Sequence, residues 1–142
     1  MANFTSELET YLAGLTTVGN SVANRIRPEV LEQNETLPAL TYNIISADHD
    51  RALSGPIGKR QTRVQIDCYA STQQAAETLA NEIRLEMDGY RGEWGTVFVN
   101  EALLERSFSA RDAPDNASDD WRFATVLEFM VIHSEPTLNG VQ

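Results

Sequence analysis

Few residues of this chain combine the types and the spacing that catalysis or metal binding requires. The chain contains two histidines, His49 and His133. His49 lies between Asp48 and Asp50, and these three side chains could belong to a metal site. Adjacent residues of an extended chain point in different directions, so further ligands would have to come from elsewhere, such as His133. A solvated polar loop is therefore favoured over a metal site, and we expect no metal or other cofactor.

The cysteine and the second histidine lie in apolar stretches. Cys68 alternates with Val64 and Ile66, so its thiol is predicted to face the core, where burial raises its pKa and makes it unreactive. His133 ends a long apolar run and is interpreted as a residue at the edge of the core. The chain contains no Gly-x-Ser-x-Gly motif of the hydrolase type. We therefore predict that it is not an enzyme.

Two glycine-containing stretches resemble phosphate-binding motifs only superficially. In residues 55–60, Gly-Pro-Ile-Gly-Lys-Arg, the glycines are too close, and no Ser or Thr follows the lysine. In residues 89–95 the glycines follow a predicted helix, whereas a nucleotide-binding fingerprint opens one. Both stretches are interpreted as turns.

Hydrophobic periodicity predicts two helices and four strands. Apolar residues spaced by three and four predict helices over 3–15 and 72–87, with Ser71 or Thr72 as the N-cap of the second. Strands are predicted over 40–46, 62–70, 97–108 and 121–133, with a bulge in the third, because its alternation is imperfect. Loops are predicted over 48–58, 89–95 and 111–120.

The order of these elements predicts an α+β fold: a four-stranded, mainly antiparallel sheet with two helices packed on one face. The chain has 142 residues and should form a single domain over 1–142, with an ordered core over about 4–133 and a C-terminal tail over 134–142. The predicted core contains Val64, Ile66, Leu79, Ile83, Phe123, Leu127 and Phe129.

The charge of the chain restricts its partners. Eleven Lys and Arg residues stand against 21 Asp and Glu residues, which gives a net charge of −10. Sequence-specific nucleic-acid binding is not expected, because such binding needs a positive patch. Binding to an acidic membrane surface is disfavoured for the same reason, so no membrane partner is expected.

Three consecutive stretches carry a resemblance to a known family. Residues 37–55 contain Leu-Pro-Ala-Leu-Thr-Tyr followed by Asp-His-Asp and a glycine. Residues 63–70 read Arg-Val-Gln-Ile-Asp-Cys-Tyr-Ala, and an alanine-rich helix is predicted after them. In this pattern the chain resembles the tail-completion, or tail-terminator, proteins of long-tailed bacteriophages and gene transfer agents, over about residues 4–133.

The resemblance implies a structural virion protein without catalytic residues. Such proteins form a homo-oligomeric ring, expected to be a hexamer, on the last ring of the tail tube. The ring stops tube polymerisation and presents a surface to the head-completion, or connector, protein, while DNA passes through its lumen. The implied location is the head-proximal end of the virion tail, and the host cytoplasm during assembly.

Three segments are predicted to make the contacts of such a ring. The segment 48–59 is long for a hairpin loop, the tail 134–142 lies outside the core, and the outer face of the strand 62–70 carries Arg and Tyr, which are frequent interface anchors. A solvated or covered outer face is an equal alternative. The candidate interface residues are Arg51, Leu53, Lys59, Arg63, Gln65, Asp67, Tyr69, Pro136 and Leu138.

Two other classes of protein remain open at this stage. One is a small adaptor or binding module, unrelated to phages, with the same arrangement of sheet and helices. The other, less favoured, is a metal-binding enzyme that uses Asp48, His49 and Asp50. The oligomeric state distinguishes the first class from a ring-forming protein, and metal analysis tests the second.

Overall fold

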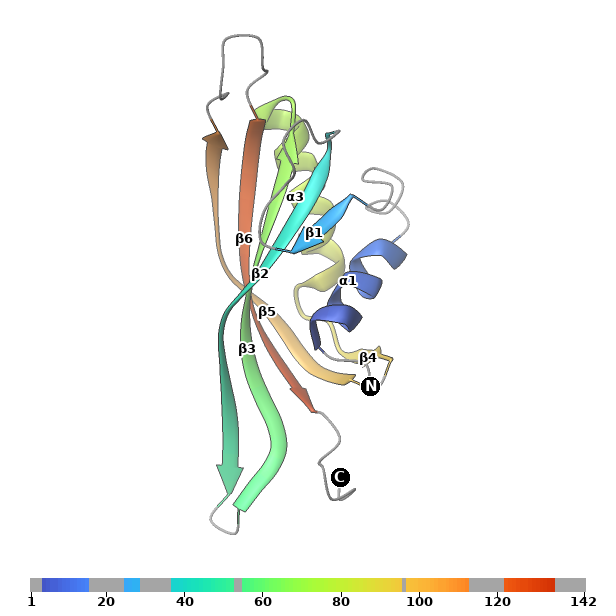
Figure 1. Ribbon diagram of the computed structural model, residues 1–142, viewed down its shortest axis with the longest axis vertical. Helices are drawn as coiled ribbons and strands as arrows, with labels where there is room; N and C mark the ends of the chain where they lie inside the picture. Colours follow the sequence, from blue (N-terminus) through green and yellow to red (C-terminus); the bar gives the residue numbers. More distant parts are fainter. Residues whose placement is uncertain are drawn as a thin grey trace.

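The computed structural model describes residues 4–15, 25–28, 37–52, 55–95, 97–112 and 122–134. A strongly twisted sheet runs along the long axis of the molecule, with both helices on the same side of it (Figure 1). The elements are α1 (Phe4–Gly14), β1 (Ile26–Pro28), β2 (Ala39–Ala52), β3 (Gly55–Ala70), α3 (Gln73–Met87), β4 (Gly92–Trp94), β5 (Val97–Asp112) and β6 (Arg122–Ser134).

The sheet has six strands in the order β1-β2-β3-β6-β5-β4, and it is mixed because β1 pairs with β2 in parallel. The fold is α+β, but the predicted four-stranded, mainly antiparallel sheet is wrong. The four long strands were predicted, whereas the three-residue strands β1 and β4 were not predicted as strands of the sheet. Segments this short contain less than two periods of alternation, so hydrophobic periodicity cannot reveal them.

Helix α3 begins and ends where its sequence predicts. The Thr72 hydroxyl accepts a hydrogen bond from the Ala75 backbone N–H over 3.1 Å, so Thr72 is the N-cap. Asp88 follows the last turn, and Gly89 then takes a φ of +81°, which favours glycine. The buried face of α3 consists of Ala76, Leu79, Ala80, Ile83 and Met87.

Helix α1 packs on the same face of the sheet through Phe4, Leu8 and Leu12. Its exposed side reaches other elements through hydrogen bonds. The Tyr42 hydroxyl of β2 donates to the Glu9 carboxylate over 2.7 Å, and the Tyr11 hydroxyl donates to the Glu86 carbonyl of α3 over 3.2 Å. These bonds connect α1 to both neighbouring elements, so the helix is fixed by packing and by polar contacts. Neither described helix is long and apolar enough to cross a membrane.

The core lies between the two helices and the sheet. Six of the seven predicted core residues are buried, and Val64, Ile66, Ile83 and Phe129 are completely inaccessible. Phe123 is the exception: it is only half-buried. It lies opposite Ala70 at the end of β3, where α3 has not yet begun, so the helix covers it incompletely.

The predicted loop 48–58 is the second error in the sequence-based fold. Strands β2 and β3 continue through this segment, and their pairing extends to Ala52 opposite Gly55. Strand β6 ends at Ser134, opposite Lys59, so the last part of β2 and β3 forms a two-stranded arm beyond it. Figure 1 shows this arm extending away from the helices at one end of the molecule.

Candidate interaction surfaces

The face of the sheet opposite the helices is the first candidate surface. Arg63, Gln65, Asp67 and Tyr69 alternate along β3 with residues buried under the helices, and all four are partly exposed. The structure therefore places these four predicted interface residues on one face. Within the described residues both helices lie on the other side of the sheet, and we call this side the helix-free face (Figure 1).

Charged side chains on the helix-free face are paired across the strands. Arg63 of β3 lies 2.6 Å from the Glu105 carboxylate of β5, and Arg106 of β5 lies 3.2 Å from the Glu128 carboxylate of β6. The side chains of the first pair are each about one-third exposed, and Arg106 is mostly exposed. The first pair is screened by solvent and contributes only about 0–1 kcal/mol to stability, whereas the Glu128 side chain of the second pair is largely buried. The main effect of the two pairs is to leave little uncompensated positive charge on this face.

Polar and aromatic contacts continue along the same face. Asp67 accepts hydrogen bonds from the Gln65 side-chain amide over 2.9 Å and from the Tyr69 hydroxyl over 3.4 Å. The Arg122 guanidinium lies 5.8 Å from the centre of the Tyr69 ring, within cation–π distance. Of the four residues predicted on β3, Arg63 is thus ion-paired with Glu105, whereas Gln65, Asp67 and Tyr69 belong to a second network of polar contacts.

The remaining predicted interface residues lie outside these contacts. Arg51 is a residue of β2 and Lys59 is a residue of β3, and both belong to the arm. Leu53, Pro136 and Leu138 lie outside the described residues. The structure therefore brings together only the β3 residues of the predicted set, and the contacts of the arm and the tail stay predictions.

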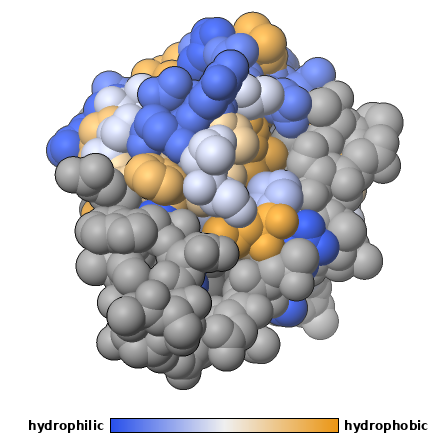
Figure 2. Space-filling view, turned by 90° about the horizontal axis from the view of Figure 1, so that it is seen from above, coloured by the Kyte–Doolittle hydropathy of each residue, from blue (hydrophilic) through white to orange (hydrophobic). Residues whose placement is uncertain are grey.

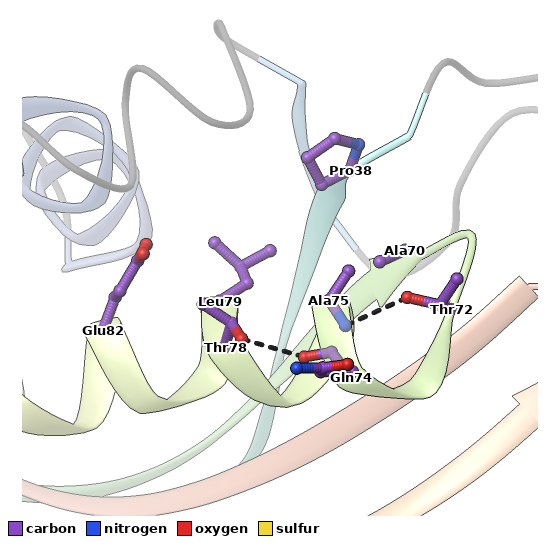
Figure 3. Close-up of a pocket in the computed structure, with 8 residues that line it drawn as sticks. All are labelled: Pro38, Ala70, Thr72, Gln74, Ala75, Thr78, Leu79 and Glu82. Carbon is purple, nitrogen blue, oxygen red and sulfur yellow. Dashed lines mark hydrogen bonds between the residues drawn. The ribbon is translucent and has the colours of Figure 1, made fainter.

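An open groove beside α3 is a second feature, and the sequence did not predict it. Its volume is about 480 Å³, and Pro38 at the start of β2 faces Leu79 and Ala75 of α3 across it (Figure 3). One buried oxygen of the Glu82 carboxylate has no hydrogen-bond partner. Viewed from this end, the molecule shows hydrophobic surface between hydrophilic side chains (Figure 2). The lining residues are Pro38, Ala70, Thr72, Gln74, Ala75, Thr78, Leu79 and Glu82.

The groove has few means of performing chemistry. Among the described residues that line it, Glu82 is the only ionisable one, and the Thr78 hydroxyl already donates to the Gln74 carbonyl over 2.9 Å. A general acid–base reaction would need a second positioned group. The sequence could not reveal this groove because Pro38 and α3 meet only in the folded chain.

The side chains of Cys68 and His133 are both buried. Cys68 is fully buried, which confirms the prediction; burial, with smaller contributions from Asp67 and Glu82, raises its pKa well above the ordinary range. His133 is also fully buried: its ring stacks on Phe4 with centroids 4.4 Å apart, and its Nε2 lies 2.8 Å from the Thr62 hydroxyl. Both side chains serve packing in this structure.

No metal site is formed by the described part of the chain, in which no three His, Cys, Asp or Glu side chains are grouped suitably. Asp48, His49 and Asp50 are residues of β2, in the part whose side chains the structure does not describe. A loop at this position is therefore excluded, while the sequence-based alternative of a metal site there is not tested.

The described residues thus form an α+β domain whose helix-free sheet face carries polar and charged side chains. Comparison with known families assigns it further: the family model of the tail completion protein gp17 matches residues 6–128, and the chain belongs to this family. Its role is accordingly that of a structural protein of the phage tail. No curated protein matches the chain.

Proposed function

We propose that this chain forms a ring, expected to be hexameric, that terminates the tail tube and joins it to the head-completion protein. Family membership over residues 6–128 is the observation that carries the proposal. The arm of β2 and β3 supports it, because a two-stranded extension beyond the end of β6 offers a surface for contact with another chain. A closed ring whose outer surface differs from the growing end of the tube cannot recruit another tube ring.

The charge of the chain agrees with a passage for DNA. The net charge of −10 repels phosphate groups within about 8 Å at physiological salt. Three arginines on the helix-free face, Arg63, Arg106 and Arg122, each lie beside a carboxylate or an aromatic ring. A ring of such subunits would offer DNA few free cations, so the double strand could slide through without being held.

Deletion of the corresponding gene from the phage tests the proposal. Without the protein, tails should grow to uncontrolled lengths or fail to join heads, as seen by electron microscopy. Complementation with the wild-type chain should restore normal particles. Normal-length tails attached to heads in the deletion strain would contradict the proposal and favour an adaptor role.

A further inference from the structure

Strands β5 and β2 are each covered along only about half of their outer edge by other described elements. On the outer edge of β5, β4 pairs only with Val97–Val99. Hydrogen bonds from the turn after α3 then reach Ala102, and the Leu104 N–H donates to the Asp88 carboxylate over 2.9 Å. From Glu105 to Asp112, no described strand pairs with this edge. We call residues 105–112 the β5 edge.

Strand β2 has the complementary arrangement. Its outer edge is covered by β1 only at Leu40–Tyr42. From Asn43 to Ala52, no described strand lies beside it. We call residues 43–52 the β2 edge. Unpaired edges of this length present rows of backbone donors and acceptors, which natural proteins usually protect.

The two free edges lie at opposite levels of the sheet. Through the cross-strand register, Phe108 of β5 is level with Thr41 of β2, and Ala102 is level with Ala47. The free part of each strand is therefore level with the covered part of the other. In Figure 1 the free part of β5 lies towards one end of the molecule, and that of β2 towards the other.

Exposed apolar side chains gather at the same two strands. Of the four large hydrophobic residues that are most exposed in the described chain, Ile45 lies on the β2 edge, and Leu103 and Phe108 lie on β5. Their exposed fractions are 45%, 39% and 38%. Apolar side chains beside unpaired backbone indicate edges that another chain covers.

We propose that the β5 edge of one copy pairs with the β2 edge of the next copy and so continues the sheet around the ring. The pairing is antiparallel, because three antiparallel pairings separate β2 from β5 within one copy. Each copy contributes a different edge to each side, so the contact is heterologous and can close into a ring. This inference rests on the ring of the proposed function and specifies how it closes.

The offset between the two edges has a geometric consequence. Joining the free part of β5 to the free part of β2 requires each copy to be staggered along the strand direction relative to its neighbour. A closed barrel requires such a stagger together with tilted strands. The uncovered halves therefore permit a closed ring of tilted strands, whereas pairing without a stagger is blocked by β1 on one side and by β4 and its turn on the other.

Crosslinking tests the joint directly. Ser46→Cys places a thiol on the β2 edge, and Ala110→Cys places one on the β5 edge. Both positions are exposed and face the same side of the sheet as Arg63 and Tyr69, and the native Cys68 is buried. With a short bismaleimide, the double variant should give a ladder of covalent oligomers that ends at the copy number of the ring. Each single variant should stay monomeric on the gel, because a heterologous contact does not bring like edges together.

The possible outcomes separate this inference from the proposed function. Crosslinked dimers of a single variant would overturn it in favour of a symmetric contact. A ring seen by electron microscopy without crosslinks in the double variant would overturn the joint and leave the tail function intact. Absence of any oligomer, in solution and on purified tails, would overturn both.

A proline variant tests the backbone pairing. The backbone N–H of Ala102 points away from β6. Because strand residues alternate in orientation and the bulge at Glu105 shifts this alternation by one residue, the backbone N–H of Ser107 also points away from β6. Ser107→Pro therefore removes a backbone N–H that points away from the sheet, a change that edge strands tolerate. The variant should weaken ring assembly at least tenfold without changing the far-UV circular dichroism. Ser107→Thr keeps the donor and is the matched control. Equal assembly of the two variants would overturn the inference.

Discussion

Leu79 and Leu85 of α3 are chemically identical and differ in burial, which gives a matched pair for the core. Leu79 is 3% exposed and Leu85 is 65% exposed. We expect Leu79→Ala to lower the free energy of unfolding by about 2–5 kcal/mol, because it removes a buried side chain and leaves a cavity. Leu85→Ala should change it by less than about 0.5 kcal/mol. Urea denaturation of both variants measures the difference, and equal losses would show that the buried face of α3 is misassigned.

The buried thiol allows a second test at the residue scale. Because burial raises the pKa of Cys68, its thiol should stay neutral and unreactive in the folded protein at pH 8–9, where a free cysteine ionises. Labelling with a thiol-specific reagent should be slow in buffer and rapid in denaturant. A labelling rate in buffer close to that of free cysteine would contradict burial.

Single-residue burial was largely predictable, and long-range pairing was not. Alternation with Val64 and Ile66 predicted the burial of Cys68, because side chains of a strand alternate between its faces. The Arg63–Glu105 pair could not be predicted, since it depends on the register of β3, β6 and β5 and on the bulge at Glu105. The core position predicted for Phe123 rests on the long apolar run 121–133, but periodicity cannot show where the covering helix begins.

At the scale of elements, the hydrogen bond from Tyr42 to Glu9 fixes α1 to β2. Burial, together with this bond, raises the pKa of Tyr42 to about 12 from its ordinary value of 10.0. The contribution of Tyr42 to the free energy of unfolding is therefore complete below about pH 10, where its hydroxyl is neutral in the folded and the unfolded chain. It is lost as the pH rises from 10 to 12, because the unfolded chain gives up the proton more readily.

Tyr42→Phe tests this link. We expect the variant to be about 1–2 kcal/mol less stable at pH 7, because the ring remains but the hydrogen bond is lost. Its stability should also fall less steeply than that of the wild type between pH 10 and 12. Denaturation at several pH values measures both effects. Parallel pH profiles of the two proteins would show that Tyr42 does not titrate with folding.

Element prediction failed where local sequence and tertiary pairing disagree. The polar residues of segment 48–58, with its glycines and Pro56, are typical of a loop, yet pairing with the opposite strand keeps this segment extended. Residues Ile26–Pro28 form strand β1 because they pair in parallel with β2. No local sequence pattern indicates this pairing. The existence of the longer elements was predicted because they contain several full periods of alternation, whereas the ends of β2 and β3 beyond residues 46 and 62 were not.

At the scale of the whole molecule, the parts that form the core and the parts available for assembly are separate. The two helices and one face of the sheet enclose the core, whereas the helix-free face lies on the opposite side of the sheet and the arm extends beyond the end of β6. A subunit built in this way can lose an assembly contact without unfolding. Variants of the assembly surfaces are therefore informative, because their effects on folding and on assembly can be measured independently.

Shortening the arm applies this separation to the proposed function. Replacing residues 50–59 with Asn-Gly would connect His49 to Arg60, which already lie opposite each other, through a two-residue turn that suits a hairpin. We expect the free energy of unfolding to change by less than about 1 kcal/mol, because the replaced segment pairs with β6 only at Lys59. Ring formation, measured by light scattering, should persist through the remaining part of the β2 edge.

The same variant should fail to cap tail tubes in complementation, because the arm is expected to contact the tube or the head-completion protein. The matched control is Ser54→Asn, which leaves the arm at its full length. This variant should complement fully. If the shortened protein gives tails of normal length joined to heads, the arm has no role in capping. The contacts with tube and head would then have to come from the ring surface formed by the rest of the subunit.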